Sequence, residues 1–313
     1  MVRPTPGAVE RGTPTSTGVE PSCYQPTPSE PAVEGTPQPP SERLRSPGPV
    51  ATPSAFEPLP FATNAALEAR IREVLGDQID SYAVAVKNLA DGSGAAVNAD
   101  KTFYAASLFK VTVMFEVFHQ RSLGLLNFDE RLVVTPYYAS FDLGTLPVAV
   151  CETLNISEAL AYMMSISDNT SAALLQDRAG SANVNRAMAA LGLSTTRLLS
   201  EDLPTTAADM ALLMEAIGRG NAVDGAASQE MVNLLASEEI DNGLRAGLPA
   251  GTLVAHKTGN WSNATHDAGI VYSPGATYVI AVLSDRAYET ALTQEVSRVV
   301  YEYYNGAGAP GGD

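Results

Sequence analysis

A serine and a lysine three residues apart are the first pair in this chain that could do chemistry. Ser107 and Lys110 stand near the start of the apolar stretch AASLFKVTVMFEVF, residues 105–118. Side chains three positions apart share one face of a helix, so the hydroxyl and the amine are predicted to be neighbours. Burial disfavours the charged form of lysine, which lowers its pKa and suits the amine to accept a proton from the serine hydroxyl. The pattern also arises by chance in a chain of this length, so it needs support from other segments.

Two later segments supply that support. They are Ser167-Asp168-Asn169, between two predicted helices, and Lys257-Thr258-Gly259, at the end of a predicted strand. Each also has a purely structural explanation, since Asp168 suits a helix N-cap and a glycine suits the turn after a strand. The order S-x-x-K, S-D-N, K-T-G is more specific than any one motif, and the chain has only four lysines, two of which fall in these motifs.

With these three motifs the chain resembles the class A β-lactamases and penicillin-binding proteins over residues 61 to 305. The step from Ser107 to Ser167 is similar to that family's spacing. The segments LPAGTLVAHKTG and TTAADMALLM also resemble family segments. The resemblance implies a serine hydrolase that works through an acyl-enzyme, without cofactor or metal, on a small β-lactam or a peptide like those of peptidoglycan.

The resemblance also implies roles for the motif residues. Ser107 would be the nucleophile, Lys110 a proton acceptor or relay, and Ser167 would pass a proton toward the leaving nitrogen. Asn169 would contact the amide side chain of the substrate and hold Lys110.

In the third motif, Lys257 and Thr258 would bind a substrate carboxylate. Gly259 would allow the substrate to approach closely along the strand. The backbone N–H groups of Ser107 and Asn260 would form the oxyanion hole.

The chain departs from the family pattern between the second and third motifs. Class A enzymes carry an omega loop there, with a glutamate that activates the hydrolytic water. The matching stretch, LGLSTTRLLSEDLPTTAADMA, is about a dozen residues shorter, and the only acids between its TTRL start and its TTAADMA end are Glu201 and Asp202. Glu201 is a candidate for a displaced base, although a solvated acid in a short loop is the simpler interpretation. We therefore expect acylation to be retained and deacylation to be slow.

The surrounding pattern predicts an α+β fold. A helix from Asn64 and two strands around DGSG come first, then a run of helices, then three strands and a closing amphipathic helix. This order predicts a mostly antiparallel sheet that both ends of the chain complete, with helices flanking it and an all-helical lobe inserted between.

Composition divides the chain into three parts. Residues 1–61 hold fifteen of the 21 prolines and few apolar residues, which predicts a disordered tail or stalk; residues 62–305 form the domain, and 306–313 a flexible tail.

The net charge of −16 argues against nucleic acid and anionic membranes as partners. No apolar run is long enough to span a membrane, and no signal peptide is evident. The family resemblance nevertheless implies an extracytoplasmic location for this protein. Cys23 and Cys151 fit either a tethering disulfide or two thiols, and oligomeric state is open.

Three functions are compatible with these observations. The first is a β-lactamase relative that is acylated and slow to turn over. The second is a penicillin-binding, D-alanyl peptidase-like or esterase activity on cell-wall substrates. The third is a non-catalytic ligand-binding domain on a stalk, which the lysine beside the serine argues against because a binding module has no need of it.

Overall fold

The domain is built on a mixed β-sheet. A computed structural model describes Cys23 and residues 43–44, 47–200 and 202–306. Within these residues six strands form the main sheet in the order β1-β3-β2-β10-β9-β8, antiparallel except for β1 beside β3. The strands are β1 (Ala62–Thr63), β2 (Tyr82–Asn88), β3 (Ser93–Val97), β8 (Leu253–Trp261), β9 (Ala264–Tyr272) and β10 (Thr277–Ser284). Strands from both ends of the chain complete the sheet, which confirms the predicted arrangement.

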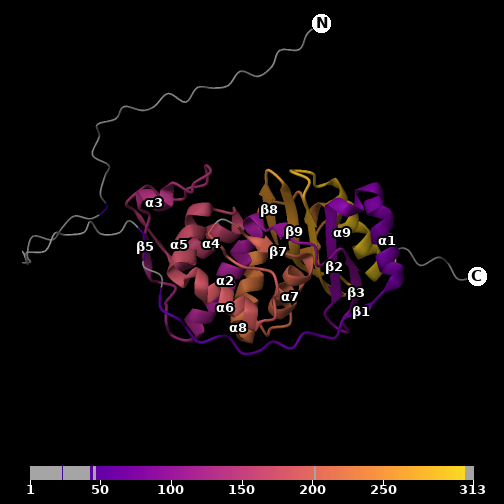
Figure 1. The fold of residues 1–313 in the computed structure, drawn as a ribbon, viewed down its shortest axis with the longest axis horizontal. Coiled ribbons are helices and arrows are strands. Elements are labelled where there is room, and N and C mark those ends of the chain that lie inside the picture. The colour runs from indigo at the N-terminus through magenta and orange to yellow at the C-terminus, as the bar shows by residue number, and fades with distance from the viewer. Residues whose placement is uncertain (1–22, 24–42, 45–46, 201, 307–313) are drawn as a thin grey trace, which may run out of the picture.

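Two helices, α1 (Ala65–Leu75) and α9 (Ala291–Tyr304), cover one face of the sheet (Figure 1). Asn64, where the first helix was predicted to begin, caps α1 by accepting a hydrogen bond from the backbone N–H of Leu67. Because side chains alternate along a strand, Val84 packs with these helices while Ala83 and Ala85 face the helical lobe. The sheet therefore separates two hydrophobic cores.

The helical lobe covers the other face. Its helices are α2 (Phe109–Ser122), α3 (Pro136–Ala139), α4 (Ile156–Ser165), α5 (Asn169–Ala179), α6 (Ser181–Ala190), α7 (Ala207–Gly218) and α8 (Gly225–Ala236). Two short strand pairs complete it, β4 (Phe103–Tyr104) with β7 (Pro204–Thr205) and β5 (Arg131–Val133) with β6 (Thr153–Asn155), and single 3₁₀ turns span Gly76–Ser81, Ala106–Leu108 and Arg245–Gly247. Among the described residues, no helix has the length and apolar character that a membrane span requires.

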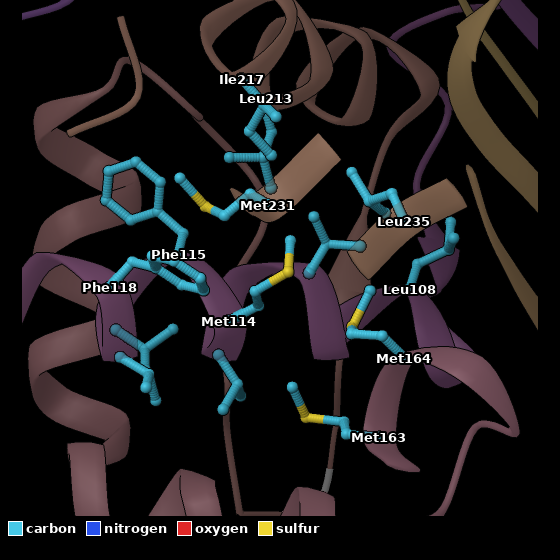
Figure 2. Close-up of a cluster of buried hydrophobic side chains, with 14 of the residues drawn as sticks. Leu108, Met114, Phe115, Phe118, Met163, Met164, Leu213, Ile217, Met231 and Leu235 are labelled. Atoms are coloured by element: carbon cyan, nitrogen blue, oxygen red, sulfur yellow. The ribbon is translucent and has the colours of Figure 1, made fainter. Parts of the chain in front are cut away.

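Helix α2 runs through the middle of this lobe. Every residue from Lys110 to Gln120 is buried, because α4, α5, α6 and α8 pack around the helix. Figure 2 shows Met114, Phe115 and Phe118 of α2 among apolar side chains from the surrounding helices. A helix that is buried on all sides holds its side chains in a densely packed, dry environment. This explains why a lysine near its start is removed from water.

Two helices of the lobe begin with side-chain caps. Asn155 and Glu158 form a complete capping box at the start of α4. Thr206 caps α7 by accepting from the backbone N–H of Asp209. The Asp209 side chain is used differently, since it accepts from the backbone N–H groups of three consecutive loop residues, Ser194, Thr195 and Thr196. The carboxylate thus fixes the start of the shortened loop.

The N-terminal segment lies against the domain before the predicted boundary at residue 62. The backbone N–H of Val50 donates to Asn183 of α6, and that of Leu59 donates to Glu215 of α7. Cys23 forms a disulfide with Cys151, which decides between the two alternatives left open by the sequence. Most of the predicted tail, residues 1–22, 24–42 and 45–46, and also residues 307–313 lie outside the described residues.

A buried ion pair connects the sheet to α7 and predicts a large effect on stability. Lys87 Nζ lies 2.6 Å from Glu215 Oε2 and 2.5 Å from the Leu59 carbonyl oxygen, and the Glu215 side chain is almost fully buried. Replacing Glu215 with alanine leaves the Lys87 charge without its carboxylate, which costs about 3 kcal/mol or more of unfolding free energy. We expect thermal denaturation to show a Tm lower by roughly 6–12 °C.

The matched control is Glu230→Ala on the neighbouring helix α8. Glu230 pairs with Arg121 at 2.8 Å, but the carboxylate side chain is 47% exposed. Exposed pairs contribute roughly 0–1 kcal/mol, so this variant should denature within a few degrees of the wild type. Equal losses in the two variants would contradict a special role for the buried pair.

Candidate active site

The three sequence motifs meet where the sheet edge at β8 faces the helical lobe. Ser107 lies in the 3₁₀ turn that leads directly into α2, and not within the α-helix itself. Ala106 and Ser167 both have positive φ, of 45° and 58°, which is uncommon for residues other than glycine. Such backbone conformations persist only where the surrounding structure enforces them, and they are frequent at active sites.

Lys110 is the centre of the cluster. Its Nζ lies 3.0 Å from Ser107 Oγ and 3.0 Å from Ser167 Oγ. It also lies 2.5 Å from the backbone carbonyl oxygen of Ser167 and 2.7 Å from Asn169 Oδ1. The carbonyl and amide oxygens can only accept, so they orient the amine and leave it between the two hydroxyl groups.

The environment of Lys110 favours the neutral amine. Burial, assisted by the positive charge of Lys257, lowers the pKa of Lys110 to about 7, although Asp168 and Glu238 act in the opposite direction. A neutral amine has a lone pair that can accept the Ser107 proton across the 3.0 Å contact. The arrangement can therefore generate a serine nucleophile at neutral pH.

The second motif serves two purposes. Asp168 is the N-cap of α5, accepting from the backbone N–H of Ser171 at 2.6 Å and from Thr145 Oγ1 at 3.1 Å. The cap holds the residues on either side of it, Ser167 and Asn169, against Lys110. The structural explanation for this motif is therefore correct, and the same cap positions the polar groups.

The third motif is paired with a residue that the sequence did not indicate. Lys257 Nζ lies 2.5 Å from Glu238 Oε2, and Thr258 Oγ1 donates to Glu238 Oε1 at 2.8 Å. The Lys257 and Glu238 side chains are both fully buried. Burial lowers the pKa of Lys257 and raises that of Glu238. Glu238 follows α8 in a loop, and no local pattern places its carboxylate under β8.

Gly259 is required by the packing of β8 against the turn that carries Ser107. A Cβ atom at this position would lie 3.1 Å from the Ala105 carbonyl oxygen and 3.3 Å from the backbone nitrogens of Ser107 and Leu108. A side chain would push the strand away from the serine. The glycine therefore sets the distance between the third motif and the first.

A cavity of about 460 Å³ opens over the cluster, within the range of small-molecule sites. Three of the predicted site residues on its wall are Ser107, Ser167 and Asn169, and two more, Thr258 and Asn260, come from β8. The other described lining residues are mainly apolar or aromatic and include Tyr104, Phe109, Tyr137, Phe141, Leu143, Leu203 and Trp261. Lys110 and Lys257 lie behind this wall.

One part of the wall comes from the N-terminal segment. Arg43 lines the cavity and forms two 2.6 Å hydrogen bonds with Asp177 of α5, whose carboxylate also accepts from Tyr138 at 3.0 Å. The backbone N–H of Leu44 donates to the Tyr138 hydroxyl at 2.7 Å. The sequence predicted a tail here, because an arginine in a proline-rich stretch gives no signal of its distant partner.

The shortened loop reaches the cavity beside Ser107. The Leu203 carbonyl oxygen accepts from the Ala105 backbone N–H at 2.7 Å, and β7 pairs with β4 immediately before the serine turn. Leu203 lines the cavity. Glu201, the candidate base of this loop, lies outside the described residues.

The histidines near the third motif have structural partners. His256 Nδ1 lies 2.9 Å from Asp267 Oδ1, and both side chains are buried in the sheet. His266 Nε2 lies 2.8 Å from the Tyr104 carbonyl oxygen, and burial lowers its pKa to about 4. His266 Nδ1 accepts from the Ser284 backbone N–H at 3.1 Å, which fixes the neutral ring. These contacts give both histidines structural roles.

Comparisons with known proteins place this arrangement in a class. The solved structure of PBP-A superposes with a TM-score of 0.75 at 27% identity, covering 80% of this chain and 100% of that one. An ancestral class A β-lactamase superposes with a TM-score of 0.68 at 27% identity, covering 76% and 99%. The fold is thus the β-lactamase/transpeptidase-like fold, and the class is that of β-lactamase-like serine hydrolases.

The sequence comparisons identify the family. Residues 66–304 match the model of the β-lactamase enzyme family. A β-lactamase of Mycobacterium tuberculosis is 31% identical over 224 residues, covering 63% of this chain and 71% of the relative. A β-lactamase of Streptomyces fradiae is 28% identical over 236 residues, covering 67% and 77%. The chain belongs to the β-lactamase enzyme family.

Proposed function

We propose that Ser107 is acylated by β-lactams and related amides or esters, with Lys110 as the general base. The observation that carries this proposal is the 3.0 Å contact between Lys110 Nζ and Ser107 Oγ, in a setting that lowers the pKa of the amine to about 7. Ser167 lies on the far side of the same amine and can pass the proton onward. The arrangement couples a nucleophile to a route for its proton.

These groups account for every bond and proton in the acylation step. The Ser107 oxygen attacks the substrate carbonyl, and its proton moves to the Lys110 amine. The backbone N–H groups of Ser107 and Asn260 stabilise the oxyanion. The carbon–nitrogen bond then breaks, and the proton moves from Lys110 through the Ser167 hydroxyl to the leaving nitrogen, which leaves an ester on Ser107.

The disulfide supports an extracytoplasmic location. Disulfides persist in oxidising compartments and are rare in the cytosol, where thiols are kept reduced. The Cys23–Cys151 bond therefore fits a protein that works in the periplasm, the cell envelope or the medium. A β-lactam or a cell-wall peptide is encountered in those places.

A second candidate, a penicillin-binding activity with little turnover, is favoured by the similarity to PBP-A together with the shortened loop. Incubation with a fluorescent penicillin followed by intact-mass measurement over time separates the candidates. A stable adduct that is absent in Ser107→Ala indicates penicillin binding, and a transient one indicates a β-lactamase. An adduct that persists in Ser107→Ala would contradict the proposed nucleophile.

The pKa of Lys110 predicts the pH dependence of acylation. Below about pH 7 the amine is protonated and cannot accept the serine proton, so the second-order rate constant should fall about tenfold for each pH unit below 6. Above pH 8 the amine is neutral and the rate should level off. Stopped-flow measurements with a fluorescent penicillin from pH 5 to 9 test this, and a flat profile would contradict it.

A further inference from the structure

Glu238 pairs with both side-chain hydrogen-bond donors of the third motif. Its Oε1 accepts from Thr258 Oγ1 at 2.8 Å and its Oε2 lies 2.5 Å from Lys257 Nζ. Glu238 is 3% exposed, and Lys257 is 0% exposed. The carboxylate therefore lies beneath the strand and is part of the protein interior.

The pairing removes the positive charge from this end of the cavity. A lysine and a glutamate together carry no net charge, whether or not a proton has moved from Nζ to the carboxylate. The charged side chains among the described lining residues are Arg43 and Asp177, which also pair with each other. An anionic group placed over Thr258 therefore meets no uncompensated cation on the cavity wall at that end.

The pairing also reverses the hydrogen-bonding character of Thr258. A threonine hydroxyl has one proton to donate, and here that proton is directed to Glu238. What the hydroxyl presents to the cavity is its remaining lone-pair capacity. A carboxylate can only accept hydrogen bonds, so it finds no partner there, whereas an amide N–H or a hydroxyl donates to the free lone pair.

We propose that the substrate carries an uncharged hydrogen-bond donor, such as the N–H of a continuing peptide or a primary amide, over Thr258, and that Glu238 sets this preference. The inference rests on the proposed acylation of Ser107 and names the class of acyl donor that the site takes. Penicillins with a free carboxylate remain substrates, but they are poor ones because their anionic group faces Thr258.

The test compares three forms of one penicillin, namely the free acid, its primary carboxamide and its methyl ester. The ester is uncharged but lacks a donor, so it separates charge from hydrogen bonding. In the wild type we expect acylation of Ser107 in the order amide, ester, acid, with the amide about tenfold or more faster than the acid. Intact-mass time courses give the three rates. An acid that reacts as fast as the amide would overturn the inference.

Two variants test whether Glu238 sets the preference for the amide over the acid. Glu238→Gln keeps the shape and leaves the Lys257 charge uncompensated, so the amide-to-acid ratio should fall about tenfold or more. Glu239→Gln removes the same formal charge from the next residue, which is exposed, and should keep the wild-type ratio. Equal ratios in the two variants would overturn the role of Glu238.

Three further outcomes are also informative. If Glu238→Gln does not fold, Glu238→Asp retains the charge but draws the carboxylate back from Thr258, and its ratio should also fall; an unchanged ratio overturns the proposal. If none of the three compounds acylates the wild type at Ser107, the proposed function itself is wrong. If all three acylate it without preference, only the substrate inference fails.

Discussion

Replacing Lys110 with methionine should reduce acylation of Ser107 by about 10²–10⁴-fold, the usual contribution of a general base. Methionine has similar length and no proton acceptor of comparable strength. Position 110 is buried in α2, so a methionine there removes the cost of holding an amine away from water, and folding should not be impaired. Second-order acylation rates from intact-mass time courses measure the effect.

Lys101→Met is the matched control for this prediction. Lys101 has an exposed amine that lies 3.1 Å from Asp285, and it does not line the cavity. The same substitution there should leave the acylation rate within about twofold of wild type, since exposed pairs contribute little. If Lys110→Met retains the wild-type rate while Ser107→Ala is inactive, another group must accept the proton.

The acyl-enzyme should persist once it has formed. Among the described residues, the only carboxylate on the cavity wall is Asp177, and Arg43 and Tyr138 already occupy its oxygens. A carboxylate engaged in this way is a poor base for water. Without a carboxylate positioned as the base for the hydrolytic water, deacylation should be slower by about 10²–10⁴-fold than with one. After excess penicillin is removed, the adduct mass should decay over tens of minutes or longer.

Two variants sharpen this prediction. Leu203 lines the cavity next to the serine turn, so Leu203→Glu places a carboxylate on the wall and should shorten the adduct lifetime. Leu199→Glu adds the same charge at a half-exposed position that does not line the cavity and should not. Rapid wild-type turnover that Glu201→Gln abolishes would contradict the prediction and identify Glu201 as the base.

Local patterns predicted the part of the site that depends on neighbouring residues. Ser107 and Lys110 are three positions apart, so the geometry of one turn brings them together. The N-cap pattern at Asp168 fixed the start of α5 and with it the positions of Ser167 and Asn169. Hydrophobic periodicity gave the sheet and its helices, because burial on one face imposes the repeat of the element.

Contacts between segments that lie far apart in the chain could not be predicted from the sequence. Glu238 meets Lys257 because β8 packs over the loop after α8, and two adjacent glutamates in a loop have the pattern of solvated residues. The same holds for Arg43 and Asp177, which are joined across the helical lobe. Such pairs depend on the tertiary path of the chain, which no window of neighbouring residues contains.

Arg43 and Leu44 are hydrogen-bonded to the helical lobe, so the cavity is built from two separate regions of the sequence. The family match begins at residue 66, yet one side of the cavity is supplied by residues that precede it. A chain trimmed to the family-matched residues keeps the serine and both lysines but loses a section of wall and the cation that faces Asp177. A substitution at Arg43 would therefore reshape the cavity from outside the family-matched part of the chain, without altering Ser107 or Lys110.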